Sequence, residues 1–145
     1  MKVLSEEKRQ FVDAFLARAL IARMATAGAD GRPHVVPVWY AWDGAALWIS
    51  SFVSTRKIRQ LRENPYLSVT VDVSGAGEKT SGVILEGVVE LVTEPRELVA
   101  SHSTWIYERY LGETGVLAEE PQSWIHDPEN LLIKLTPQEF FLWEY

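Results

Sequence analysis

The sequence contains no cysteine among its 145 residues. Disulfides and thiolate metal sites are therefore excluded, and the absence fits a reducing compartment such as the cytoplasm. The sequence also lacks an apolar run as long as a membrane span. Its first ten residues, MKVLSEEKRQ, include acidic residues where a secretory signal peptide has a basic and then an apolar stretch. We therefore expect a cytoplasmic protein without a membrane partner.

Positive charge is also in short supply, with 14 Lys and Arg against 20 Asp and Glu, a formal net charge of −6. Affinity for nucleic acid comes largely from basic surface, so a general nucleic-acid binder is not expected. None of the three histidines has another histidine at a metal-ligand spacing, and no metal site is predicted. The sequence has no P-loop, no GxGxxG motif and no serine-nucleophile elbow, so no catalytic side chain is assigned.

Hydrophobic periodicity predicts a mainly β fold with three helices. Helices are expected over 5–19, over 54–63 and from Glu94-Pro95 onward, and strands over 20–26, 34–42, 45–51, 67–73, 83–92, 131–135 and 140–145. Asp43-Gly44 is a hairpin signal, and residues 74–82 read as a loop. Gly87 inside a strand indicates a bulge or a close backbone approach. We expect a small antiparallel barrel with helices over its ends, formed by residues 1–145 as one domain.

A basic cluster stands out in this acidic chain, in the segment SFVSTRKIRQL. Arg56 and Lys57 fall in the first turn of the short predicted helix, where the helix dipole disfavours cations. A bound anion reverses that preference, and the hydroxyls of Ser54 and Thr55 add to the free backbone N–H groups. Two readings stay open on spacing alone, namely a phosphate pocket and a solvated basic face.

Two more basic residues follow on the same predicted helix. Arg59 and Arg62 are three residues apart, so they lie on one helical face. They are candidates for an outer rim that meets a longer anionic tail.

Three segments in order resemble the pyridoxamine 5′-phosphate oxidase-like family of flavin-binding split barrels. These are GRPHVVPVWYAWDG, LWISSFVSTRKIRQLRENPYLSVTVD and VILEGVVEL. The resemblance runs from about Leu20 to the terminal FFLWEY and is most specific in the strand, S-x-R-K, helix and Asn-Pro segment. It implies a six-stranded antiparallel split barrel that forms a homodimer, with two flavin sites at the dimer interface.

The resemblance also implies roles for individual residues around FMN. Twelve positions are cofactor-binding candidates by this likeness: Pro37, Val38, Trp39, Ser50, Ser51, Ser54, Thr55, Arg56, Lys57, Arg59, Gly82 and Trp105. Arg56 and Lys57 would bind the 5′-phosphate, with Ser54 and Thr55 lining its turn. Ser50 and Ser51 would follow the ribityl chain.

The remaining candidates belong to the flavin ring. The segment 37–39 would pass beside it, and strand 83–87 with Gly82 would approach from the partner chain. Either Trp39 or Trp105 is a candidate for a flat wall against the ring, and for each tryptophan core packing is the alternative. A proline such as Pro37 within a strand suits an edge or bulged position.

The implied function is an FMN-dependent oxidoreductase acting on a small molecule. Two departures argue against pyridoxamine phosphate oxidation itself. Val36 stands where the biosynthetic oxidases carry an extra phosphate-binding Arg, and residues 142–145 replace their basic terminal motif. The alternatives are a reductase that uses the 8-hydroxy-5-deazaflavin coenzyme and a flavin-binding module without turnover.

Overall fold

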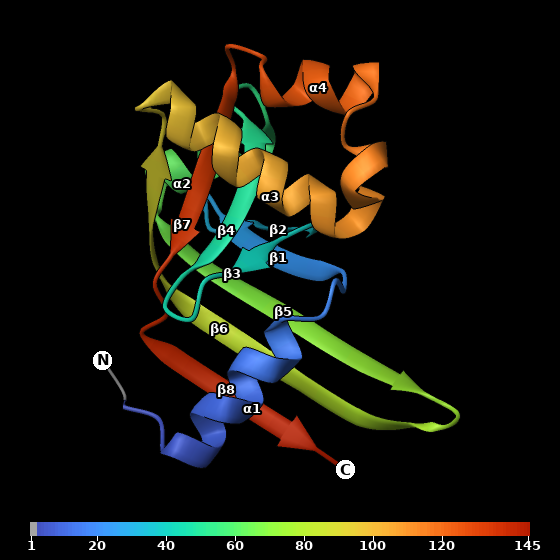
Figure 1. Cartoon of the computed structure of the whole chain (residues 1–145). Helices are drawn as coiled ribbons and strands as arrows, with labels where there is room; N and C mark the ends of the chain where they lie inside the picture. Colours follow the sequence, from blue (N-terminus) through green and yellow to red (C-terminus); the bar gives the residue numbers. More distant parts are fainter. Residues whose placement is uncertain (1–2) are drawn as a thin grey trace.

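The computed structural model of the chain describes residues 3–145 (Figure 1). Its helices are α1 Glu6–Leu16, α2 Arg56–Glu63, α3 Arg96–Gly115 and α4 Glu119–Ile125. Its strands are β1 Ala22–Ala27, β2 Pro33–Val38, β3 Ala41–Trp42, β4 Leu47–Phe52, β5 Tyr66–Gly75, β6 Glu78–Val92, β7 Asn130–Leu135 and β8 Glu139–Glu144. The expected mainly β architecture with covering helices is confirmed. The described residues form eight strands, compared with the seven expected from periodicity and the six implied by the resemblance, and α4 was not expected.

The strands form one sheet in the order β2-β1-β5-β6-β7-β4-β3, with β8 added alongside β6. Every strand pair is antiparallel. The 15-residue strand β6 pairs with β5 over residues 78–88, with β8 over residues 81–86 and with β7 over its last four residues, 89–92. It is therefore the strand shared by both halves of the barrel.

Gly87 lies in β6 just before the strand changes partners. A Cβ there would lie 3.1 Å from the carbonyl oxygen of Thr136 and 3.2 Å from the backbone nitrogen of Gln138. That nitrogen donates to the carbonyl of Glu86 at 2.8 Å. The expected close backbone approach at this glycine is thus confirmed, and it brings the turn between β7 and β8 onto β6.

The strand predicted over 34–42 is wrong in its middle, where it divides into β2 and β3. Trp39 and Tyr40 leave the ladder because α3 holds them. The Trp39 ring stacks on Tyr110 with centroids 4.8 Å apart, and the Tyr40 N–H donates to the Tyr110 hydroxyl at 3.2 Å. Tertiary contacts to aromatic residues far along the chain therefore override local strand propensity.

The loop predicted over 74–82 is also wrong, because most of it extends the hairpin of β5 and β6. Val73 pairs with Ser81 and Gly75 with Glu78, so only Ala76 and Gly77 remain between the strands. Gly77 has φ 81°, a conformation that favours glycine. The polar composition reflects an exposed hairpin end rather than irregular backbone.

Helices cover two sides of this sheet. Ser5 caps the N-terminus of α1, since its hydroxyl accepts from the Lys8 N–H at 3.3 Å. The helix buries Val12, Phe15 and Leu16 in the main core. α3 packs over β4 and β7, where a second core cluster gathers around Trp48 and Leu132 (Figure 1). None of the helices in the described part of the chain combines the length and hydropathy of a membrane-spanning segment.

Candidate functional site

The N-terminal end of α2 is the cationic feature that the sequence singled out. Its first turn contains Arg56 and Lys57 and no acidic residue. Thr55 is the residue at the helix start, yet its side chain does not cap the helix. The first backbone N–H groups of α2 are therefore left without a side-chain acceptor, in the place where a helix favours an anion.

Hydroxyl groups line the turn that precedes α2. The Thr55 hydroxyl donates to the carbonyl of Phe52 at 2.8 Å, and its oxygen lies 3.3 Å from that of Ser51. Ser54 is exposed, and its backbone N–H donates to the Glu129 carboxylate at 3.2 Å. The structure thus brings Ser51, Ser54 and Thr55 together ahead of the two cations.

The cations of α2 form no ion pair with an acid in the described part of the chain. Among residues 3–145 the three ion pairs are Arg9–Asp13, Arg18–Glu78 and Lys79–Glu144, so no cation of α2 takes part in one. Glu63, the acid of α2 itself, turns away and accepts from the Ala29 N–H at 2.7 Å.

Two titratable groups near the start of α2 have pKa values below their usual ones. Burial lowers the pKa of the half-buried Lys57. Burial also lowers the pKa of His34 on β2, and the positive charges of Arg56 and Lys57 lower it further. A phosphate bound at this turn would offset both effects, since it supplies the missing negative charge. The residues present therefore fit a phosphate group.

Contacts to β1 hold α2 in place. The Thr26 hydroxyl donates to the side-chain oxygen of Gln60 at 2.6 Å, and both residues are buried. One turn later, Glu63 binds the turn after β1, where a Cβ on Gly28 would lie 2.7 Å from the Glu63 carboxylate. These contacts fix the direction in which the cationic end of α2 points.

A groove of about 490 Å³ lies between α2 and the turn joining β1 to β2. Three arginines line it, Arg32, Arg56 and Arg59. Its two carboxylates already accept hydrogen bonds from backbone N–H groups: Asp30 from Arg32 at 3.0 Å, and Glu63 as described above. Of the two arginines predicted to form an outer rim, Arg59 lines this groove together with Arg32, whereas Arg62 does not.

Ser50 and Ser51 point to opposite faces of β4, as neighbours on a strand do. Ser51 faces the turn before α2, whereas the Ser50 hydroxyl belongs to a network beneath α3. It donates to the Asn130 side chain at 2.7 Å, accepts from the Tyr107 hydroxyl at 3.3 Å and lies 3.0 Å from the Ser103 hydroxyl. A role for Ser50 along a ribityl chain stays a prediction.

The other candidates lie away from the cationic turn. Pro37 and Val38 end β2, which is an edge of the sheet, as the proline indicated. Trp39 packs on α3, with its ring against Tyr110 and 5.9 Å from the ring of Tyr107. Its role beside a flavin ring stays a prediction.

Trp105 and Gly82 each lie against an aromatic residue of the same chain, away from α2. Trp105 is 36% exposed on α3, and its ring lies 6.0 Å from that of His102. Gly82 is buried on β6 opposite Trp143 of β8, whose indole occupies the space that a Cβ would need. Neither residue joins the cationic cluster of the same chain, so both remain candidates for a contact across a dimer.

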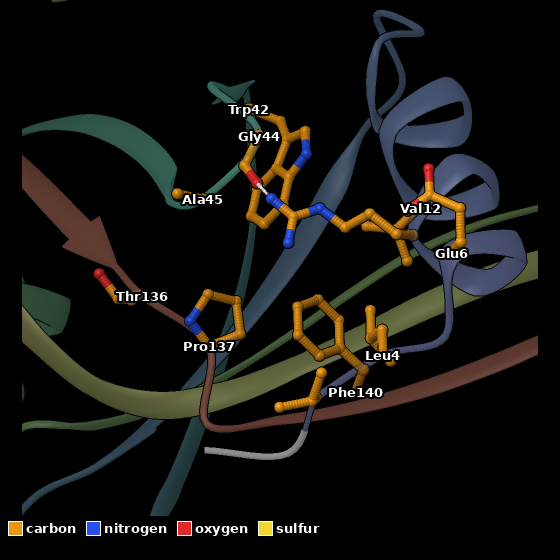
Figure 2. A pocket seen from close by; sticks show the side chains of 11 residues that line it. Leu4, Glu6, Val12, Trp42, Gly44, Ala45, Thr136, Pro137 and Phe140 are labelled. Atoms are coloured by element: carbon orange, nitrogen blue, oxygen red, sulfur yellow. Dashed lines mark hydrogen bonds between the residues drawn. The ribbon is translucent and has the colours of Figure 1, made fainter.

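A second pocket, of about 370 Å³, lies between α1, the β3–β4 hairpin and the turn before β8 (Figure 2). Its walls are mostly apolar, with Leu4, Trp42 and Phe140 among them. Arg9, the cationic side chain among the described residues that line it, donates to the Gly44 carbonyl and lies 3.7 Å from the Asp13 carboxylate. That charge is already compensated, so this pocket suits a phosphate less well than the turn at α2.

Sequence reasoning missed three neighbours of the cationic turn, namely Arg32, His34 and Glu129. The segment GRPH gave no sign of belonging to the cluster, because its approach to α2 depends on how the β1–β2 hairpin lies against that helix. Glu129 comes from a turn more than 70 residues later.

Comparisons with known proteins place these observations in a family context. A family model described as pyridoxamine 5′-phosphate oxidase matches residues 9–144. The crystal structure of the conserved hypothetical protein Rv2991 from Mycobacterium tuberculosis is similar, with a TM-score of 0.78 and 26% identity over 98% of this chain and 86% of the other. No curated protein matches the chain in sequence.

Two further solved structures share the fold. An F420 reductase has a TM-score of 0.71 and 26% identity, over 89% of this chain and 94% of its own. A FAD-binding protein from Mesorhizobium loti has a TM-score of 0.64 and 22% identity, over 98% and 96%.

Proposed function

Because the chain belongs to the pyridoxamine 5′-phosphate oxidase family, we propose that it binds FMN and acts as an oxidoreductase on a small molecule. The family binds flavin-type cofactors. The proposal goes further and names FMN as the cofactor of this chain. The observation that supports it is the first turn of α2, which contains Arg56 and Lys57 and no acidic residue. The Thr55 side chain does not cap the backbone N–H groups at this end of the helix.

Each group at this turn would have a distinct part. Arg56, exposed and always charged, would pair with the phosphate oxygens, and Lys57 would supply a second cation from a partly desolvated position. Ser51, Ser54 and Thr55 would contribute hydroxyl groups at the same turn. A bound flavin supplies the hydride chemistry, so the chain itself has to bind and orient it and leave one face accessible.

The proposal includes a homodimer with flavin sites at its interface. The edge strand β2 carries Val35, which is 63% exposed, and Phe141 on β8 is 50% exposed. A second copy would cover such apolar positions. It would also bring Gly82 or Trp105 of one chain toward Pro37, Val38 and Trp39 of the other, which is where the flavin ring would lie.

Binding of FMN and of riboflavin to the full-length protein tests the function. The two ligands share the ring and differ in the phosphate, so quenching of their fluorescence isolates the contribution of the phosphate site. We expect FMN to bind at least tenfold more tightly than riboflavin, and reduction of the bound flavin by NADH or NADPH to be measurable. Equal affinities would contradict the phosphate site, and binding without reduction by either donor would favour a non-catalytic flavin-binding module.

The groove beside α2 favours one alternative, a deazaflavin-dependent reductase. Arg32 and Arg59 extend the positive surface beyond Arg56, and a cofactor with a longer anionic tail would use that extension. The similarity to an F420 reductase agrees with it, since F420 is an 8-hydroxy-5-deazaflavin. Tighter binding of F420 than of FMN, lost in Arg32→Ala and Arg59→Ala but kept in Arg62→Ala, would support this alternative over FMN.

A further inference from the structure

Glu129 places a negative charge at the cationic turn. Its backbone carbonyl accepts from the Val53 N–H at 3.0 Å, and its carboxylate accepts from the Ser54 N–H at 3.2 Å. Val53 and Ser54 come directly before Thr55, the residue at the start of α2. One residue from a distant turn therefore makes two contacts to the turn in which the proposed phosphate would bind.

The backbone of Glu129 is held firmly. Its N–H donates to the Asp127 carboxylate at 2.8 Å, and the Asn130 N–H donates to the Asp127 carbonyl at 2.9 Å. The Arg96 guanidinium donates to the carbonyls of Asn130 and Asp127, at 2.9 and 3.1 Å. Asn130 itself is 1% exposed.

The side chain of Glu129 is less constrained than its backbone. The residue is exposed, and among residues 3–145 its carboxylate makes one hydrogen bond, the 3.2 Å contact to the Ser54 N–H. The carboxylate can therefore leave the turn while the backbone stays in place.

The negative charge of the Glu129 carboxylate affects how an anion binds at this turn. A carboxylate near the start of a cationic helix is favourable when no other anion is present. A phosphate at the same turn competes for the Ser54 N–H and is repelled by the carboxylate. We propose that Glu129 is an internal counter-anion of the phosphate turn, displaced by the phosphate of the cofactor, and that it limits affinity for phosphate-bearing ligands. This inference rests on the proposed phosphate site.

The test compares the full-length wild type, Glu129→Gln and Glu113→Gln in titrations with FMN and riboflavin. Glu113 is an exposed acid of α3 and serves as a control for net charge. We expect Glu129→Gln to bind FMN roughly tenfold more tightly than the wild type, because one negative charge close to the phosphate is gone. Riboflavin affinity should be unchanged, and Glu113→Gln should match the wild type for both ligands.

A second measurement needs no flavin. Without ligand, Glu129→Gln should have a lower Tm than the wild type, and inorganic phosphate should raise the Tm of the variant more than that of the wild type. Unchanged or weaker FMN binding by Glu129→Gln overturns the inference, even if the wild type prefers FMN. A wild type that binds FMN and riboflavin equally overturns the proposed phosphate site, and the role of Glu129 falls with it.

Discussion

The hydroxyl of Thr26 on β1 donates to the side-chain oxygen of Gln60 on α2 at 2.6 Å, with both residues at least 90% buried. Together with Ile58 and Leu61, which α2 buries in the main core, this hydrogen bond holds the helix against β1. The start of α2 follows the end of β4 closely in the chain and lies beside the β1–β2 turn.

Loss of the Thr26 hydroxyl should therefore destabilise the fold. In Thr26→Val the buried Gln60 oxygen loses its partner, and we expect unfolding free energy to fall by about 1–3 kcal/mol. Urea denaturation measures this change. Thr26→Ser keeps the hydroxyl and should lose clearly less, and equal losses in both variants would show that packing rather than the hydrogen bond matters.

Removal of both cations at the start of α2 should weaken FMN binding. For the double variant Arg56→Ala with Lys57→Ala we expect a loss of at least about 2 kcal/mol, since each charge-assisted contact contributes roughly 1.5–3 kcal/mol. Fluorescence titration gives the affinity. Riboflavin binding should change little, and Arg62→Ala, a cation of the same helix outside the groove, is the matched control. Unchanged FMN affinity in the double variant would refute the phosphate site.

The pKa of His34 should rise when FMN binds. In the free protein it lies below its usual 6.5 because of burial and then the charges of Arg56 and Lys57. A bound phosphate offsets those charges, so the complex holds a proton on His34 to higher pH than the free protein does. Binding therefore takes up protons as the pH falls through this range. NMR titration of the imidazole with and without FMN measures the shift, which riboflavin should not reproduce.

The Gly82→Ala substitution should destabilise the chain through Trp143. The indole of Trp143 occupies the space where the new Cβ would lie, so either the ring or the β6–β8 pairing has to move. We expect a loss of about 1–3 kcal/mol in unfolding free energy. Combining it with Trp143→Leu should cost less than the sum of the two single changes, whereas simple additivity would place the strain elsewhere.

Part of the site could be predicted because its signals are local. Arg56 and Lys57 follow two hydroxyl residues at a helix start, and Asn64-Pro65 ends that helix, so both charge and position can be read from adjacent residues. The alternation of Ser50 and Ser51 on β4 is also local, since strand geometry turns neighbours to opposite faces. The tertiary structure decided which residues each serine contacts. Ser51 lies against Thr55, whereas Ser50 contacts Ser103 and Asn130.

Other features could not be read from neighbours in sequence. The break at Trp39 depends on Tyr110, about 70 residues away, and the exposed end of the β5–β6 hairpin resembled a loop because its residues are polar. Arg32, His34 and Glu129 reach α2 only through the hairpin and turn geometry of distant segments.

The sequence by itself determined the mainly β architecture, the helix that carries the cations and the family, because hydrophobic period, turn residues and charge order act over a few residues. Only the tertiary structure decided which acidic side chains lie near those cations. It turned Glu63 toward Ala29, set Glu129 against Ser54 and left the α2 cations without an ion pair among residues 3–145. Electrostatic interactions depend on distance in space, and distance in space is set by strand register and packing rather than by order along the chain.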